Sequence, residues 1–167
     1  PTRLTPRADG TGNIAWSDYG PRSGKPVLVV HSSSSCRHVP RRLVRSLQAR
    51  GYRPIAIDRP GFGLTDPVAD SLRIGPHPAA VPDTLAVMDE LGIGSFDLVA
   101  RGGGQFVVAL HRLAPDRVAQ VVLVSPSPHT SSAGRRKNVI GAAKEAYFRR
   151  PALARIVARM LVSQLTF

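Results

Sequence analysis

The chain has 167 residues, of which 43% are hydrophobic and 20% charged, values typical of a globular protein with a buried core. The single cysteine, Cys36, excludes an internal disulfide and a cysteine metal cluster, and it predicts a reducing compartment such as the cytoplasm. No apolar run approaches the length of a membrane span, and the first residues lack the apolar core of a secretion signal. We predict no metal, no cofactor and no membrane span.

The net charge of +12 is high, and arginine supplies most of it. Residues 37–53 hold six arginines and no acid, and residues 135–159 hold eight cations beside one glutamate. Such clusters attract nucleic acid, anionic lipid or an acidic protein. Because no nucleic-acid motif accompanies these clusters, they are interpreted as solvated helix faces, and a nucleic-acid partner is not predicted.

The first half of the chain alternates between strand and helix patterns. Residues 1–12 are polar and are predicted to be a loose lead-in. Alternation over 13–19 predicts a strand at the rim of a sheet, and the continuous apolar run 26–31 is typical of a strand buried on both faces. A helix is expected over 40–50, with its leucines on one face, and a further strand over 52–57.

The same alternation continues through the middle of the chain. A loop rich in Pro and Gly covers 67–78, and a helix is predicted over 79–91. Strands are expected over 95–99 and 118–124, separated by another helix. This order predicts an α/β fold, a mostly parallel sheet with helices on both faces.

The character of the chain changes after residue 129. Residues 1–129 carry every predicted strand, whereas two helices and no strand are predicted in residues 130–167. The apolar strand 118–124 then has a free edge, and such an edge invites association with another strand. We therefore expect either self-association through 118–124 or a longer protein of which this chain is a fragment.

Residues 96–106, FDLVARGGGQF, run from a strand through three glycines into an apolar helical pattern. Strand, tight turn and helix form the nucleophile elbow G-x-S-x-G, whose central residue sits in a strained turn. Ala100 and Gly104 occupy the small positions, so Gly102 occupies the position of the nucleophile. Glycine has no nucleophilic atom, and the elbow is therefore predicted to be present without its nucleophile.

Over residues 13–130 the chain resembles the N-terminal part of an α/β-hydrolase. Besides the elbow, four landmarks occur in the order of that family: His31 at the end of a buried strand, GYRPIAIDRPGFGLTD at 51–66, LGI at 91–93 and APDRV at 114–118. The resemblance implies a small-molecule substrate or ligand. It also implies that residues 130–167 begin the helical lid that this family inserts after its sixth strand.

The family attacks esters, amides or related carbon centres with a nucleophile, a His, an acid that orients it, and backbone amides that hold the oxyanion. Its chain order places the acid and the His after residue 167, and no His of this chain matches the catalytic one. The resemblance assigns the oxyanion amides to Ser33 and Gly103. The pair His31-Ser32 stands where the family has His-Gly, and the missing glycine predicts a conflict in the loop conformation.

Four other features near the predicted pocket carry weaker predictions. The serines of 32–35 and Cys36 are minor candidates for a displaced nucleophile, because a polar run in a loop is usually solvated and Cys36 has no identifiable base. Arg101, beside the nucleophile position, is a candidate for binding an anion, although the family varies there. His38 is a candidate to line the pocket, although an exposed helix start is favoured.

Three functional hypotheses stay open. The first is a lidded α/β-hydrolase, inactive in covalent hydrolysis as the chain stands, with Gly102 either natural or an engineered replacement of Ser. The second is a non-catalytic binder or non-hydrolytic pseudoenzyme that keeps the pocket and the oxyanion amides for a carbonyl ligand. The third, and the least favoured, is a basic interaction module whose binding weakens steeply with salt.

Overall fold

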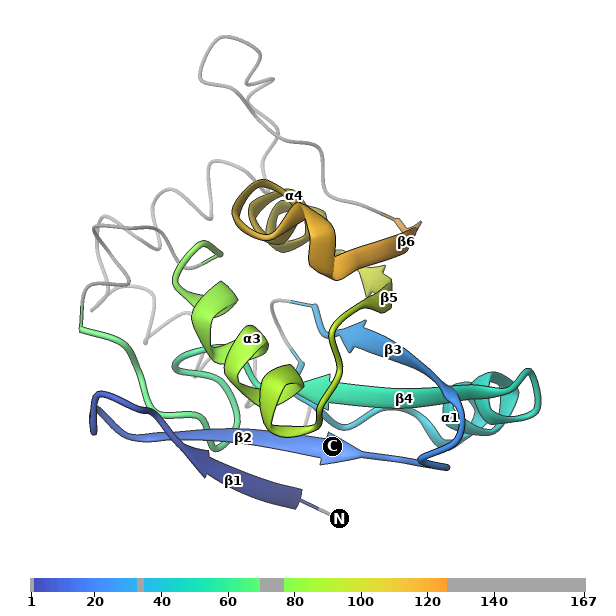
Figure 1. Ribbon diagram of the computed structural model, residues 1–167, viewed down its shortest axis with the longest axis horizontal. Coiled ribbons are helices and arrows are strands. Elements are labelled where there is room, and N and C mark those ends of the chain that lie inside the picture. The colour runs from blue at the N-terminus through green and yellow to red at the C-terminus, as the bar shows by residue number, and fades with distance from the viewer. Residues whose placement is uncertain (1, 33–34, 70–76, 126–167) are drawn as a thin grey trace, which may run out of the picture. The chain divides into compact units, whose positions relative to one another are not determined.

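The computed structural model describes residues 2–32, 35–69 and 77–125. Within these ranges a six-stranded sheet has the order β1-β2-β4-β3-β5-β6 (Figure 1). The strands are β1 (Thr2–Pro6), β2 (Asn13–Asp18), β3 (Lys25–Val30), β4 (Tyr52–Ile57), β5 (Phe96–Arg101) and β6 (Val118–Val124). The helices are α1 (Arg41–Gln48), α3 (Ala80–Glu90) and α4 (Gly104–Leu113), with a 3-10 turn at Pro115–Arg117. The lid predicted for 130–167 lies outside the described residues.

Strands β4, β3, β5 and β6 lie side by side in this order and run parallel to one another. Strand β2 is antiparallel to both of its neighbours, β1 and β4. The apolar runs of β3 and β4 lie in the middle of the sheet, where Val27, Leu28 and Ile55 are almost fully buried. Helix α1 contacts β4, while α3 and α4 contact each other and pack against β2 and β5 (Figure 1). The predicted α/β fold with a mostly parallel sheet is confirmed. No helix in the described part of the chain is long and apolar enough to cross a membrane.

The N-terminus differs from the prediction of a loose lead-in. It contains β1, which pairs with β2 so that Thr2 lies opposite Ser17, and β2 therefore lies inside the sheet instead of at its rim. Polar contacts hold this edge strand: Thr5 Oγ1 accepts a hydrogen bond from Trp16 Nε1 at 2.8 Å, and the Arg3 guanidinium lies 5.3 Å from the Trp16 ring centroid. Because β1 is held by such contacts and buries few apolar side chains, its sequence carries no hydrophobic period.

A buried ion pair joins the β1–β2 hairpin to α3. Arg7 Nε and Nη2 donate to the two carboxylate oxygens of Asp83 at 2.9 and 2.8 Å, and both side chains are only 6% exposed. Nη2 also donates to the carbonyl oxygen of Asp66 at 2.7 Å. The two parallel bonds form the bidentate arrangement in which an arginine and a carboxylate interact most strongly.

Replacing Asp83 with asparagine leaves the Arg7 guanidinium buried without a counter-charge. We expect Asp83→Asn to lower the free energy of unfolding by about 3 to 5 kcal/mol, measured by urea denaturation. Asp89→Asn is the matched control, because Asp89 binds Arg117 at 2.6 Å but its side chain is 63% exposed. The control variant is expected to lose less than about 1 kcal/mol. Equal losses in the two variants would contradict the role given to the buried pair.

Candidate functional site: the turn between β5 and α4

The turn that joins β5 to α4 has the geometry of a nucleophile elbow. Gly102 adopts φ +67°, in the left-handed region, and its N–H donates to the carbonyl oxygen of Val124 at 3.2 Å. Gly103 follows as the residue that precedes the first turn of α4. A strand thus ends, one residue turns the chain sharply, and a helix begins at once.

The absence of a side chain has a different structural effect at Gly103 than at Gly102. A Cβ on Gly103 would lie 2.8 Å from Val30 Cγ1, so the absence of a side chain lets α4 approach β3. A Cβ on Gly102 would meet Ser32 Cβ at 3.6 Å, an ordinary contact, and no nearer atom of the described residues. There is room for a side chain at position 102, and the constraint there is backbone conformation alone.

The N–H of Gly103 is an available donor at this turn. Gly103 is buried, and no described residue accepts a hydrogen bond from its N–H. The group lies at the N-terminus of α4, where the helix dipole adds positive potential. Such a donor is suited to hold an oxygen that carries or develops negative charge. Ser33, predicted to supply the second amide, lies outside the described residues.

His31 and Ser32 lie at the carboxyl end of β3, next to this turn. His31 is buried, with Nδ1 2.9 Å from the carbonyl oxygen of Ser32, and Nε2 accepts the N–H of Arg59 at 3.2 Å. These two partners place the proton on Nδ1 and leave the ring neutral. Burial lowers the pKa of His31, and the positive charge of Arg59 lowers it further.

Ser32 fits its position without strain. Among the described residues other than glycine, only Ser125 has a positive φ, so Ser32 does not adopt the left-handed conformation that favours glycine. The conflict predicted from its replacement of the family's glycine is therefore absent. The carbon framework of Ser32 instead lies against position 102, at the 3.6 Å noted above.

The other predicted site residues lie apart from this cluster. Arg101 is exposed at the end of β5, and His38 is exposed before α1. The structure thus brings together Gly102, Gly103 and the pair His31-Ser32, and it leaves Arg101 and His38 at the surface. Within the described ranges no group of His, Cys, Asp and Glu side chains is arranged to hold a metal ion.

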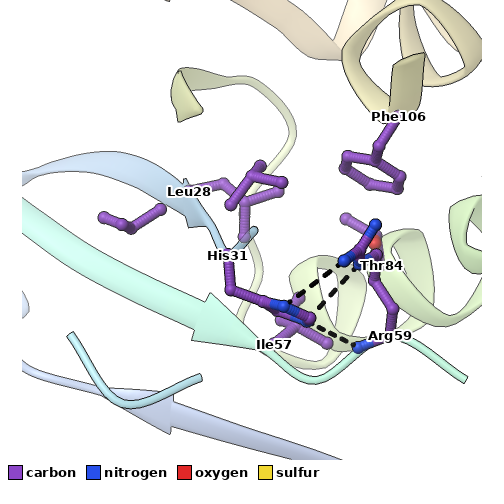
Figure 2. Close-up of a pocket in the computed structure, with 8 residues that line it drawn as sticks. Leu28, His31, Ile57, Arg59, Thr84 and Phe106 are labelled. Atoms are coloured by element: carbon purple, nitrogen blue, oxygen red, sulfur yellow. Dashed lines mark hydrogen bonds between the residues drawn. The ribbon is translucent and has the colours of Figure 1, made fainter. Parts of the chain in front are cut away.

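Sequence reasoning missed Arg59, which lies two residues after the end of β4 and is only 7% exposed. Figure 2 shows its guanidinium beside the ring of His31. Nη2 donates to the carbonyl oxygen of Ser32 at 3.2 Å, and Nη1 lies 3.5 Å from Nδ1 of His77. Its place at the carboxyl end of a parallel strand is the one signal that was available, because ligands of open α/β sheets bind at that edge.

Comparison with known proteins decides the family. The profile of the alpha/beta hydrolase fold matches residues 25–163, most of the chain. The chain belongs to the alpha/beta hydrolase fold family. Over 134 residues, 77% of its length, it is 31% identical to a haloalkane dehalogenase of Psychrobacter cryohalolentis. Over 124 residues, 72% of its length, it is 34% identical to a non-heme chloroperoxidase of Streptomyces lividans.

Solved structures agree with this assignment. A mutant epoxide hydrolase of Vigna radiata superposes on 87% of the chain with a TM-score of 0.67 and 27% sequence identity. The chain spans less than half of these relatives: 44% of the dehalogenase, 43% of the chloroperoxidase and 45% of the epoxide hydrolase chain. The resemblance to an α/β-hydrolase, found on the sequence landmarks, is confirmed.

The packing of this α/β-hydrolase predicts different outcomes for alanine at two glycines. Gly103→Ala is expected to lower the free energy of unfolding by about 1 to 3 kcal/mol, because the new methyl group overlaps Val30. Gly94→Ala is the control: a Cβ there meets no atom within 4 Å and its φ is not positive, so a change of less than about 1 kcal/mol, towards higher stability, is expected. Thermal and urea unfolding measure both. A neutral Gly103→Ala would contradict the close approach of α4 to β3.

Proposed function

We propose that this α/β-hydrolase chain forms a small-molecule pocket that holds a carbonyl or related ligand without forming a covalent intermediate. The observation that carries the proposal is Gly102, at the apex of the elbow with φ +67°. Covalent hydrolysis in this fold starts from a nucleophilic side chain at that position, activated by a base. Glycine leaves the position without an attacking atom, and covalent turnover is not expected.

Binding of a ligand oxygen by backbone N–H groups does not require a side chain at position 102. The buried N–H of Gly103 is available to an oxygen of the ligand, and the proposed second donor is the N–H of Ser33. The similar proteins named above include a haloalkane dehalogenase and an epoxide hydrolase, and both names describe action on small molecules. Residues 130–167 are proposed to begin the helical lid of this family, and Cys36, a free thiol, fits a reducing cytoplasmic setting.

A serine at position 102 tests the proposal directly. The site has room for the side chain, and the left-handed backbone costs about 1 to 2 kcal/mol for a residue with a Cβ. In the full-length protein, we expect Gly102→Ser to be labelled by a fluorophosphonate probe and to hydrolyse p-nitrophenyl acetate. Gly102→Ala is the matched control, because it carries the same backbone strain without a nucleophile.

Each outcome of this experiment bears on a different part of the proposal. The Gly102 protein is expected to remain unlabelled and to bind a small ketone or amide saturably. Labelling of the Gly102 protein, or accumulation of an acyl intermediate on it, would mean that another residue is the nucleophile. Equal inactivity of the serine and alanine variants would mean that the turn is not a catalytic elbow.

We also propose that the free edge of β6 mediates self-association. In the described part of the sheet, β6 pairs with β5 on one side and with no strand on the other. Four consecutive side chains of β6, pointing to both faces, are 41 to 54% exposed: Val121, Val122, Leu123 and Val124. An apolar edge strand of this kind is a template for pairing with a second chain.

A lysine in the centre of β6 should disrupt this pairing. We expect the chain to sediment as a species larger than a monomer at increasing concentration, and Val122→Lys to remain monomeric, because the charge has no partner across a paired edge. Val108→Lys is the control, since Val108 is also exposed, at 41%, but belongs to helix α4 and not to the edge strand. A wild-type chain that is monomeric at every concentration would refute the proposal.

A further inference from the structure

Buried arginines in this protein follow a rule with one exception. In the described part of the chain, four arginines are more than nine-tenths buried. Three of them bind a carboxylate: Arg7 with Asp83, Arg37 with Asp58, and Arg53 with Asp18. Arg59 is the fourth, and no carboxylate of the described residues pairs with it. A buried cation is costly without a counter-charge, and the described residues supply none to Arg59.

The remaining contacts of Arg59 leave most of its hydrogen-bonding capacity unused. A guanidinium has five N–H donors. Within the described residues, one bond has ordinary geometry, from Nη2 to the carbonyl oxygen of Ser32 at 3.2 Å. The other contacts join its nitrogens to ring nitrogens of His31 and His77 at 3.4 to 3.5 Å, the outer limit for a hydrogen bond. None of these partners carries negative charge.

The side chain of Arg59 lines a small cavity beside His31. Figure 2 shows Arg59 and His31 together, with the ring of Phe106 and the side chain of Thr84 nearby. The cavity measures about 10 Å³, which is room for one particle the size of a water molecule. Its other walls are apolar and include Leu28 and Ile57. Apolar walls lower the local dielectric constant and strengthen the attraction between a guanidinium and an anion.

We propose that Arg59 binds a small monovalent anion in this cavity, beside the ring of His31. The cavity holds one particle the size of a water molecule, so it takes one oxygen of a carboxylate group as it stands, takes a halide ion once the lining side chains move slightly outward, and is too small for a tetrahedral dianion such as sulfate. The site is separate from the position of Gly102, and it does not depend on the proposed function. Arg59 also donates to the carbonyl oxygen of Ser32, so the site adjoins the carboxyl end of β3.

Chloride is the first probe, and its binding is measured by the line width of the 35Cl NMR signal. In chloride buffer at constant ionic strength, we expect the full-length protein to broaden this signal, and bromide and formate to reverse the broadening by competition. Sulfate at the same ionic strength is expected to compete at least tenfold less effectively. Formate alone, in chloride-free buffer, is expected to raise the melting temperature saturably.

Variants of Arg59 show whether chloride binds at this site or is attracted by the positive charge of the whole protein. Arg59→Met should remove the broadening, and Arg59→Lys, which keeps the charge without the planar fork, should weaken chloride binding at least tenfold. Arg45→Gln is the control, because Arg45 is exposed on α1 and its loss removes the same charge. Circular dichroism shows which variants are folded, and Arg59→Lys provides the test where Arg59→Met does not fold.

The outcomes distinguish the source of the anion. Competition by bromide alone identifies a halide site, and competition by formate identifies a site for a carboxylate group; each supports the proposal. The proposal is overturned if the wild-type protein shows neither chloride broadening nor saturable stabilisation by formate. It is also overturned if sulfate competes as well as formate, or if folded Arg59 variants behave like Arg45→Gln, because both results describe a diffuse surface charge.

Discussion

One buried carboxylate, that of Asp58, connects the loops from which the pocket is built. It is fully buried, accepts the backbone N–H of Arg37 at 2.6 Å and that of Leu64 at 3.1 Å, and pairs with the Arg37 guanidinium. The same guanidinium donates to Thr2 Oγ1 at 2.8 Å. The Asp58 carboxylate and its partner Arg37 therefore connect the loop after β3, the loop after β4 and strand β1. These hydrogen bonds and the ion pair offset the cost of burying the charge of Asp58. The placement of the pocket residues depends on this arrangement.

The turn between β5 and α4 meets two separate requirements of the fold, a close helix approach and a left-handed backbone. The approach of α4 to β3 depends on Gly103, whose missing side chain leaves space for Val30. Gly102 contributes only the left-handed backbone, which glycine adopts without the strain of about 1 to 2 kcal/mol that other residues carry there. Glycine at this position therefore carries none of the backbone strain that a residue with a side chain would carry there.

Sequence patterns predicted the parts of this protein that local rules determine. The apolar run of β3 and the strand–glycine–helix turn around Gly102 were predictable, because burial on both faces and a tight turn each constrain a few consecutive residues. Strand β1 was not, since its pairing depends on Thr5 and Trp16 meeting across a hairpin. Arg59 was not either: arginine is usually exposed, and only the tertiary fold encloses this one between β4 and the ring of His31.

The charge of +12 has different consequences at the surface and in the interior. The arginines of α1, such as Arg41 and Arg45, are exposed, and at physiological salt their fields are screened within about 8 Å. Arg59 lies among apolar side chains, where water and counterions do not screen it. Its neighbours His31 and His77 stay neutral, since burial and the charge of Arg59 lower the pKa of both rings. Selective anion recognition in this arginine-rich protein is therefore proposed for Arg59, the one buried arginine of the described residues that pairs with no carboxylate among them, whereas the exposed arginine clusters contribute attraction without selectivity.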